Sequence, residues 1–275
     1  MSRTLMIGLL TMLLLANNPL RAWAETVLEK IGRTGEMTVG APRDAVLFSS
    51  LDTDKKWTGY SVELIKLIHQ QVETQLNKTI KLNLVPVGVD NRFEKVQRGQ
   101  VDLICGTTTI TQERLEMVDF SIPFFMTGSQ FLILKSEVNN FDVNETLKDV
   151  PIAYIPNTTS DFLIRQIYPL ANWQAVKSRE EAIEKLTQGK IKAIVSDGIL
   201  LVGELVNTGK NLREFVLTPS QPITTELHGC MIPKNEPQLK ELVNFTIISD
   251  DNVNLQKKWF DVNDGPYPYN VRIKP

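Results

Sequence analysis

One pattern occurs twice in this sequence and constrains its fold more than any other feature. The segments Gln97–Ile104 and Thr187–Ile194 both read as the end of a helix, a glycine that stops it, and an apolar strand. Eight residues after each glycine stands a polar side chain, Thr107 in the first case and Asp197 in the second. Helices that alternate with strands are typical of α/β folds. We therefore predict two α/β lobes, each built around this unit.

Strand and helix signals also alternate along the rest of the chain. The apolar side chains of Ile65, Ile68 and Val72 recur at helical spacing and fall on one stripe of a predicted helix. The predicted strands cover residues 37–40, 81–87, 101–104 and 191–195, and the predicted helices cover residues 61–76, 92–97, 180–187, 238–248 and 253–260.

Two apolar segments can carry the chain between the lobes. Gln130–Lys135 leaves the first lobe, and Leu227–Ile232 returns to it. Two crossings make the first lobe discontinuous and give a two-strand hinge. Two lobes also suit the chain length, which exceeds that of a usual single core. The expected division is a signal segment over residues 1–24, the first lobe over 25–134 and 225–275, and the second lobe over 135–224.

The amino terminus has the features of a secretion signal. A basic start is followed by an apolar run that is short for a membrane span, and Ala22-Trp23-Ala24 is a small-x-small cleavage signal. A membrane anchor is the weaker alternative, because Asn17, Asn18 and Pro19 interrupt the run. We expect cleavage near Ala24 and a soluble periplasmic protein.

The chain has two cysteines, Cys105 and Cys230. In an exported protein such a pair can oxidise and stay oxidised. The alternative is two buried free thiols, because the sequence does not show whether the two Cα atoms lie close enough for a bridge. Both readings stay open at this point.

A cluster of hydroxyls follows the predicted strand that ends at Ile104. Thr107 and Thr109 come directly after it, and Arg114 stands in the first turn of a helix that begins near Thr111. Ligands of open α/β sheets bind at the carboxyl ends of strands, and a helix start with an arginine suits a carboxylate. Asp197 at the matching place in the other lobe would suit an ammonium. The alternative is that Thr111 only caps its helix and Arg114 faces solvent.

Several segments together resemble the family 3 extracellular solute-binding proteins of ABC amino-acid importers, and most closely the glutamate/aspartate-binding branch. The segments that carry the resemblance are 59–61, 90–93, 105–121, 157–160, 196–198 and 228–231. The resemblance implies the type II periplasmic binding protein fold, an acidic L-amino acid as ligand, the membrane subunits of an ABC permease as partner, and no enzymatic activity.

The resemblance also implies a role for individual residues. The α-carboxylate would be held from the first lobe by Thr107, Thr109 and Arg114. From the second lobe, Thr158 or Thr159 would close over that carboxylate, and Asp197 would take the α-ammonium. The side-chain carboxylate of the ligand would contact Arg43 and Arg92.

Two positions depart from the pattern of the branch. Val89 stands where a small hydroxyl residue is expected, which leaves glutamine or asparagine open as additional ligands. Arg179 stands about where the relatives have a histidine that contacts the distal carboxylate. Arg179 either replaces that histidine or faces solvent at the start of its helix.

Other functions find less support in the sequence. The formal net charge is -2, and nothing suggests nucleic acid as a partner. The two histidines, His69 and His228, lack the spacing of metal ligands, so we expect neither metal nor cofactor. We expect a monomer. The alternative function is a periplasmic cyclohexadienyl dehydratase acting on arogenate or prephenate, because the same fold hosts that enzyme.

Overall fold

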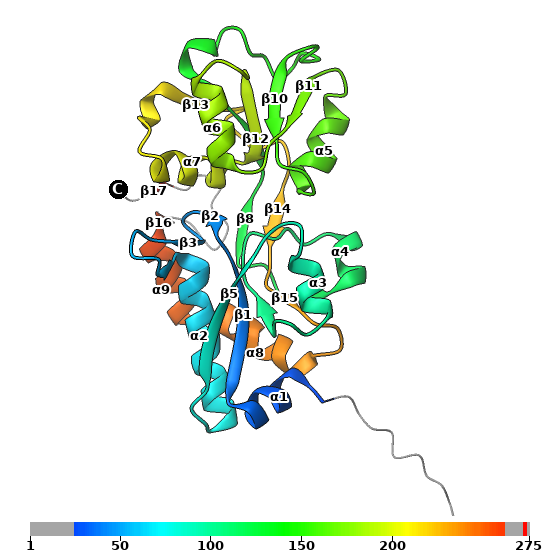
Figure 1. Ribbon diagram of the computed structural model, residues 1–275, viewed down its shortest axis with the longest axis vertical. Helices are drawn as coiled ribbons and strands as arrows, with labels where there is room; N and C mark the ends of the chain where they lie inside the picture. The colour runs from blue at the N-terminus through cyan, green and yellow to red at the C-terminus, as the bar shows by residue number, and fades with distance from the viewer. Residues whose placement is uncertain (1–24, 262–271, 274–275) are drawn as a thin grey trace, which may run out of the picture.

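The computed structural model describes residues 25–261 and 272–273, which form two α/β lobes joined by a pair of strands (Figure 1). The predicted signal segment, residues 1–24, lies outside the described residues. Among the described helices, none combines the length and the apolar character that a membrane span needs.

The first lobe is built on a five-stranded sheet with the order β5-β1-β6-β15-β7. Strand β1 runs parallel to β5 and β6, whereas β15 is antiparallel to β6 and β7. The strands are β1 (Glu36–Pro42), β5 (Lys81–Val87), β6 (Leu103–Ile104), β7 (Asp119–Phe120) and β15 (Met231–Ile232). A small second sheet contains β2 (Asp44–Ala45), β3 (Ser49–Leu51) and β4 (Trp57–Thr58).

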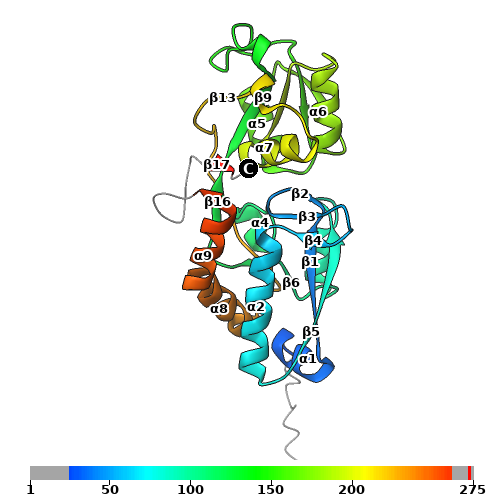
Figure 2. The ribbon, with the colours of Figure 1, turned by 90° about the vertical axis from the view of Figure 1, so that its left-hand side faces the viewer.

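Helices pack around this sheet, with α2, α8 and α9 side by side (Figure 2). The predicted apolar stripe of α2 is buried, and Asn77 ends that helix in the left-handed conformation. The helices are α1 (Val27–Thr34), α2 (Tyr60–Leu76), α3 (Arg92–Gln97), α4 (Gln112–Met117), α8 (Pro237–Ile248) and α9 (Asp250–Trp259). After α9, β16 (Phe260–Asp261) pairs with β17 (Arg272–Ile273).

The second lobe has its own five-stranded sheet, with the order β11-β10-β12-β9-β13. Its strands are β9 (Ser129–Leu134), β10 (Pro151–Tyr154), β11 (Asn172–Ala175), β12 (Ala193–Asp197) and β13 (Phe215–Thr218). Its helices are α5 (Thr159–Ile167), α6 (Arg179–Thr187) and α7 (Gly198–Asn207), with short 3-10 turns at η1 (Lys135–Glu137) and η2 (Leu212–Glu214).

The structure shows the repeated unit in both lobes, as α3 followed by β6 and as α6 followed by β12. Gly99 and Gly189 stand between helix and strand with φ values of 62° and 69°. A residue with a Cβ is strained in that left-handed conformation, which explains why glycine occupies both positions. The observed two-lobe α/β architecture confirms the predicted fold class.

Two antiparallel strands, β8 (Phe125–Thr127) and β14 (Glu226–His228), run side by side between the lobes (Figure 1). Strand β9, which the sequence places at the end of the first lobe, pairs instead with β12 and β13 of the second sheet. The chain therefore enters the second sheet at Ser129, several residues before the boundary drawn after residue 134. The apolar residues of β9 do not reveal which sheet the strand joins, because a buried strand has the same composition in either sheet.

The two cysteines form a disulfide that connects both passages of the chain through the first lobe. Cys105 follows β6, Cys230 precedes β15, and their Cα atoms lie 4.2 Å apart. Both residues are fully buried. This settles the open alternative in favour of a bridge.

Candidate functional site

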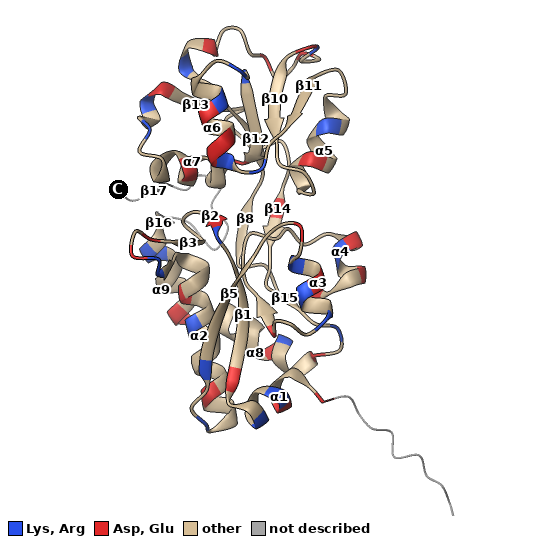
Figure 3. Cartoon of the chain, in the orientation of Figure 1, with Lys and Arg blue, Asp and Glu red and all other residues tan. Residues whose placement is uncertain are grey.

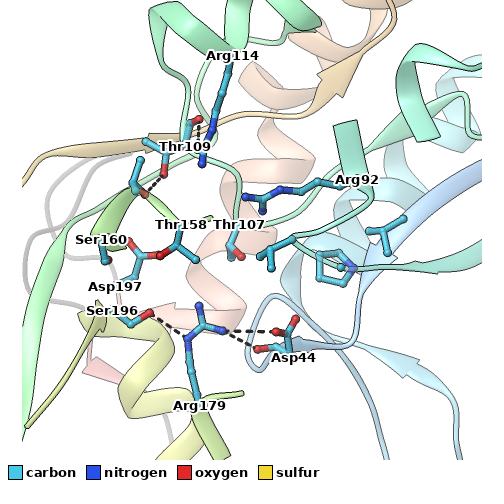
Figure 4. A pocket seen from close by; sticks show the side chains of 15 residues that line it. Asp44, Arg92, Thr107, Thr109, Arg114, Thr158, Ser160, Arg179, Ser196 and Asp197 are labelled. Atoms are coloured by element: carbon cyan, nitrogen blue, oxygen red, sulfur yellow. Dashed lines mark hydrogen bonds and ion pairs between the residues drawn. The ribbon is translucent and has the colours of Figure 1, made fainter. Parts of the chain in front are cut away.

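A cavity lies between the two lobes, where the carboxyl ends of β1, β5, β6 and β12 meet (Figure 4). Eight of the nine residues that the sequence predicts for ligand binding line it. These are Arg92, Thr107, Thr109, Arg114, Thr158, Thr159, Arg179 and Asp197. They come from four helices, the end of one strand and the loops after β6 and β10, so the fold alone brings them together.

Arg43 is the predicted residue that the structure does not bring to the cavity. Its side chain is exposed, whereas its neighbours Pro42 and Asp44 both line the cavity. Arg43 stands at a bend between β1 and β2, and this bend leaves its side chain in solvent while the residues on either side reach the cavity. The acidic Asp44, which the sequence did not single out, takes the place at the cavity that was expected for Arg43.

Arg114 is held at the first-lobe end of the cavity by its own helix start. The hydroxyl of Thr111 accepts a hydrogen bond from the Arg114 N–H at 3.2 Å, and Nη1 of Arg114 donates to the carbonyl of Thr109 at 2.8 Å. Arg114 is buried, and burial lowers its pKa. The sequence offered a helix cap and an anion site as alternatives, and the structure shows the cap together with an arginine that lines the cavity.

Arg92 is one of three buried arginines that converge on the cavity (Figure 4). Its Nη1 donates to Thr108 at 3.2 Å, while its Nε has no hydrogen-bond partner among the described residues. Burial and the nearby charge of Arg114 lower the pKa of Arg92 to about 9. A buried cation with an unused donor is costly unless an anion pairs with it.

Arg179 enters the cleft from the second lobe, at the start of α6. Its Nε donates to the hydroxyl of Ser196 at 3.1 Å, and its Nη1 donates to the Asp44 carbonyl at 3.1 Å. The Asp44 carboxylate lies 3.9 Å from the same Nη1. This arginine is buried and links the two lobes across the cavity (Figure 4). The structure thus decides the open alternative: Arg179 faces the cleft and not the solvent.

Asp197 lies at the end of β12 and carries an unpaired acceptor. Its side chain is buried, and Oδ1 has no hydrogen-bond partner among residues 25–261. Burial, together with the negative charge of Glu226, raises the pKa of Asp197 well above its usual value. A cationic group of a ligand would pair this oxygen and favour its charged form.

Thr158 and Thr159 stand at the start of α5, which opens onto the cavity from the second lobe. The Thr158 hydroxyl donates to the Ile155 carbonyl at 2.8 Å and accepts from the Asp161 N–H at 3.2 Å, so it serves as the helix cap. The start of a helix carries free N–H groups and a partial positive charge, which suit a carboxylate.

Val89 also lines the cavity, and it packs against the apolar core of the second lobe. Its side chain therefore contributes an apolar contact between the lobes at a position where the family pattern suggested a hydroxyl. Any polar group of a ligand near Val89 must find its hydrogen bonds elsewhere.

The sequence did not point to Glu226, which lies buried on the hinge strand β14. Glu226, Asp197 and His228 bring their oxygen and nitrogen atoms within 4.8 Å of one another. Burial lowers the pKa of His228 to about 4, so its imidazole is neutral at neutral pH. This cluster resembles a metal site in composition, but the Glu226 oxygens already accept hydrogen bonds from four hydroxyls.

Charged residues are interspersed along both lobes, without one block of either sign on the helices in view (Figure 3). The gathering of three arginines around one cavity therefore stands out against the formal net charge of -2. With Asp44 and Asp197 also present, the cavity offers separate places for anionic and cationic groups. Such a site suits a zwitterion that carries a further anionic or polar group.

Comparison with known proteins supports this reading. Residues 37–262 match the family model of the bacterial extracellular solute-binding proteins, family 3. The glutamate/aspartate import solute-binding protein of Escherichia coli (strain K12) is 30% identical over 244 residues, which cover 86% of this chain and 79% of that protein. A glutamine-binding protein of Geobacillus stearothermophilus is 32% identical over 178 residues, or 64% of this chain and 66% of that protein.

Among solved structures, the ancestral amino acid-binding protein AncCDT-1, a precursor of cyclohexadienyl dehydratase, superimposes with a TM-score of 0.74. It is 25% identical in sequence, and the match covers 85% of this chain and 99% of that chain. The family match spans both lobes and every residue that lines the cavity. The chain therefore belongs to the bacterial extracellular solute-binding proteins of family 3, and it is a binding protein rather than an enzyme.

Proposed function

We propose that this protein captures an acidic L-amino acid in the periplasm and delivers it to the membrane subunits of an ABC permease. Glutamate and aspartate are the proposed ligands. The observation that carries the proposal is that the cavity holds Arg92 and Arg179 in addition to Arg114 and Asp197. One arginine and one carboxylate suffice for the α-groups of any amino acid, so the additional buried cations call for a second carboxylate.

The geometry suggests how the α-groups are divided. Arg114 and the start of α5 suit the α-carboxylate, and Asp197 suits the α-ammonium. The hydroxyl proton of Thr109 is donated to Glu226 at 2.8 Å, so Thr109 Oγ1 can meet a ligand only as an acceptor. We therefore assign this hydroxyl to the α-ammonium, whereas the family resemblance assigned Thr109 to the α-carboxylate.

Arg92 and Arg179 would share the side-chain carboxylate of the ligand. The two cations stand on opposite lobes, so a ligand that reaches both stabilises the closed arrangement. Ligand binding would then shift the balance between open and closed forms, and the permease would recognise the closed form. Asp44 partly balances the charge of Arg179, which leaves a net positive distal end for one carboxylate.

Replacing Arg92 or Arg179 with glutamine should selectively weaken the binding of acidic amino acids. Each change removes a charged partner of the side-chain carboxylate, which corresponds to roughly a ten- to a hundred-fold rise in Kd for glutamate and aspartate. The Kd for glutamine should change less, because its amide carries no charge. Isothermal titration calorimetry of the mature protein measures all three ligands directly.

The Arg43→Gln variant is the matched control, because Arg43 is an exposed arginine outside the cavity. It should bind like the parent protein. If the parent protein binds only neutral or basic amino acids, the proposed acidic ligand is wrong. Product analysis after incubation with arogenate and prephenate tests the dehydratase alternative in the same samples, and turnover of either compound would overturn the binding-protein reading.

A further inference from the structure

Glu226 is a buried carboxylate that four hydroxyl groups surround. Thr109 donates to its Oε2 at 2.8 Å, and Thr159 donates to the same oxygen. Ser129 and Thr224 each donate to Oε1 at 2.8 Å. Glu226 itself is only 1% exposed, so these hydroxyls take the place of water around its charge.

These hydrogen bonds keep Glu226 ionised. Burial alone would raise its pKa, but the hydrogen bonds from Thr159, Thr109, Ser129 and Thr224 outweigh burial and lower the pKa. An ionised carboxylate accepts hydrogen bonds and never donates them. Every hydroxyl that contacts Glu226 must therefore turn its single proton towards the carboxylate.

Two of these four hydroxyls also line the ligand cavity, those of Thr109 and Thr159. Because their protons are directed at Glu226, they can offer only lone pairs to a ligand. A neutral group at position 226 would not impose this direction, since an amide can donate as well as accept. The chemical character of this wall of the cavity is thus set by a residue that does not line it.

The same carboxylate connects both lobes. Thr109 belongs to the first lobe, and Thr159 begins α5 in the second lobe. Their Oγ1 atoms lie 3.2 Å apart, and Glu226 lies on the hinge strand β14 between the lobes. A second chain of hydroxyls continues into the second lobe, from Glu226 to Ser129 and on to Ser160 at 2.7 Å. Movement of one lobe against the other must therefore disturb the hydrogen bonds of Glu226.

We propose that Glu226 is a positioning residue that turns the hydroxyls of Thr109 and Thr159 into acceptors for the ligand ammonium and couples their placement to lobe closure. This inference rests on the amino-acid-binding part of the proposed function, but it does not depend on whether the ligand is acidic. Every α-amino acid presents the same ammonium group at this wall.

The test is the isosteric variant Glu226→Gln, studied with whichever amino acid binds the parent protein. The Kd should rise roughly ten- to a hundred-fold, because the carboxylate no longer holds the hydroxyls of Thr109 and Thr159 as acceptors for the charged ammonium. The unfolding midpoint of the ligand-free variant should also fall at neutral pH, because the lowered pKa of Glu226 means that its charged form stabilises the folded protein. The Kd is therefore the deciding measurement, since a purely structural role would lower the midpoint and leave the Kd unchanged.

Two further variants distinguish an action of Glu226 through Thr109 from a general disturbance of the hinge. Thr224→Val removes a hydroxyl donor on the side of Glu226 away from Thr109 and Thr159, and Thr224 does not line the cavity. The Kd of the Thr224→Val variant should stay within about threefold of the parent value, because the loss of a hydrogen bond to the charged ammonium would change it more.

Thr109→Val removes the acceptor through which Glu226 acts. The double variant Glu226→Gln/Thr109→Val should therefore be little weaker than the weaker of the two single variants.

The outcomes can be distinguished. A Glu226→Gln variant that binds within about threefold of the parent overturns the inference, since the lost charged contact would then contribute almost nothing. Additive effects in the double variant overturn it as well, because Glu226 would then act without Thr109. If Glu226→Gln fails to fold, Glu226→Asp keeps the acceptor-only carboxylate, and it should bind more tightly than Glu226→Ala. A parent protein that binds only neutral amino acids refutes the acidic ligand and leaves the Glu226 test intact.

Discussion

Replacing Asp197 with asparagine should strongly weaken amino-acid binding while making the ligand-free protein more resistant to unfolding. Asp197 is buried, and burial together with the charge of Glu226 raises its pKa. The folded ligand-free protein therefore holds a carboxylate whose charged form is unfavourable. The ammonium of a ligand compensates that charge, and its loss should raise Kd at least about a hundred-fold, as for other buried charge pairs.

The stability effect has a defined dependence on pH. Because the pKa of Asp197 is higher in the folded than in the unfolded protein, the folded protein binds more protons above the usual pKa of 3.8. Asp197 thus lowers the free energy of unfolding as pH rises from 3.8 through its raised pKa. The advantage of the Asp197→Asn variant should accordingly be larger at neutral pH than at acidic pH. Thermal unfolding of both proteins without ligand across this range measures it.

Glu204→Gln provides the matched control for Asp197→Asn. Glu204 is also a buried carboxylate of the second lobe, and burial raises its pKa too, but it lies outside the cavity. Its replacement should leave the Kd unchanged. If Asp197→Asn binds ligand with the affinity of the parent, Asp197 does not contact the ammonium. If the Asp197→Asn variant unfolds more readily than the parent at neutral pH, then the charge of Asp197 is better compensated in the folded protein than its burial suggests.

Removing the disulfide should lower the stability of the protein more than any single substitution at the cavity. Cys105 and Cys230 are 125 residues apart in the sequence, so the bridge strongly restricts the unfolded chain. The chain-entropy relation gives about 5 kcal/mol for a loop of this length. For a protein of this size, that loss corresponds to a fall of roughly 10 to 20 °C in Tm.

The Cys105→Ala/Cys230→Ala variant and the reduced parent protein test this together, by urea unfolding monitored with fluorescence. Both should lose a similar free energy of unfolding, because the cross-link is absent in each. A loss in the variant alone would assign the effect to the packing of the buried side chains. A loss below about 1 kcal/mol in both would contradict a role for the bridge in restricting the unfolded chain.

Several features of the fold could be read from local sequence. The stripe of Ile65, Ile68 and Val72 predicted α2 to within one residue at its start. Gly99 and Gly189 marked the two helix ends correctly, because each adopts the left-handed conformation that glycine allows. These signals depend on neighbours within a few positions of the chain, so the sequence expresses them directly.

Features that depend on contacts across the cleft were harder to predict. Arg179 could have faced solvent or ligand, and its position was decided by Asp44 on the other lobe. Arg43 and Asp44 are adjacent in sequence, yet only Asp44 reaches the cavity. The choice between such neighbours depends on the local path of the backbone at the end of β1, which composition does not reveal.

Glu226 shows the same limit more clearly. Its four hydroxyl donors come from positions 109, 129, 159 and 224, so no spacing in the sequence marks them as a group. The sequence by itself determined the two α/β lobes, the hydroxyl cluster after β6 and the family, because these follow from short-range patterns and motifs. Only the tertiary structure decided the disulfide, the inward position of Arg179 and the surroundings of Glu226, because these depend on packing that brings distant segments together.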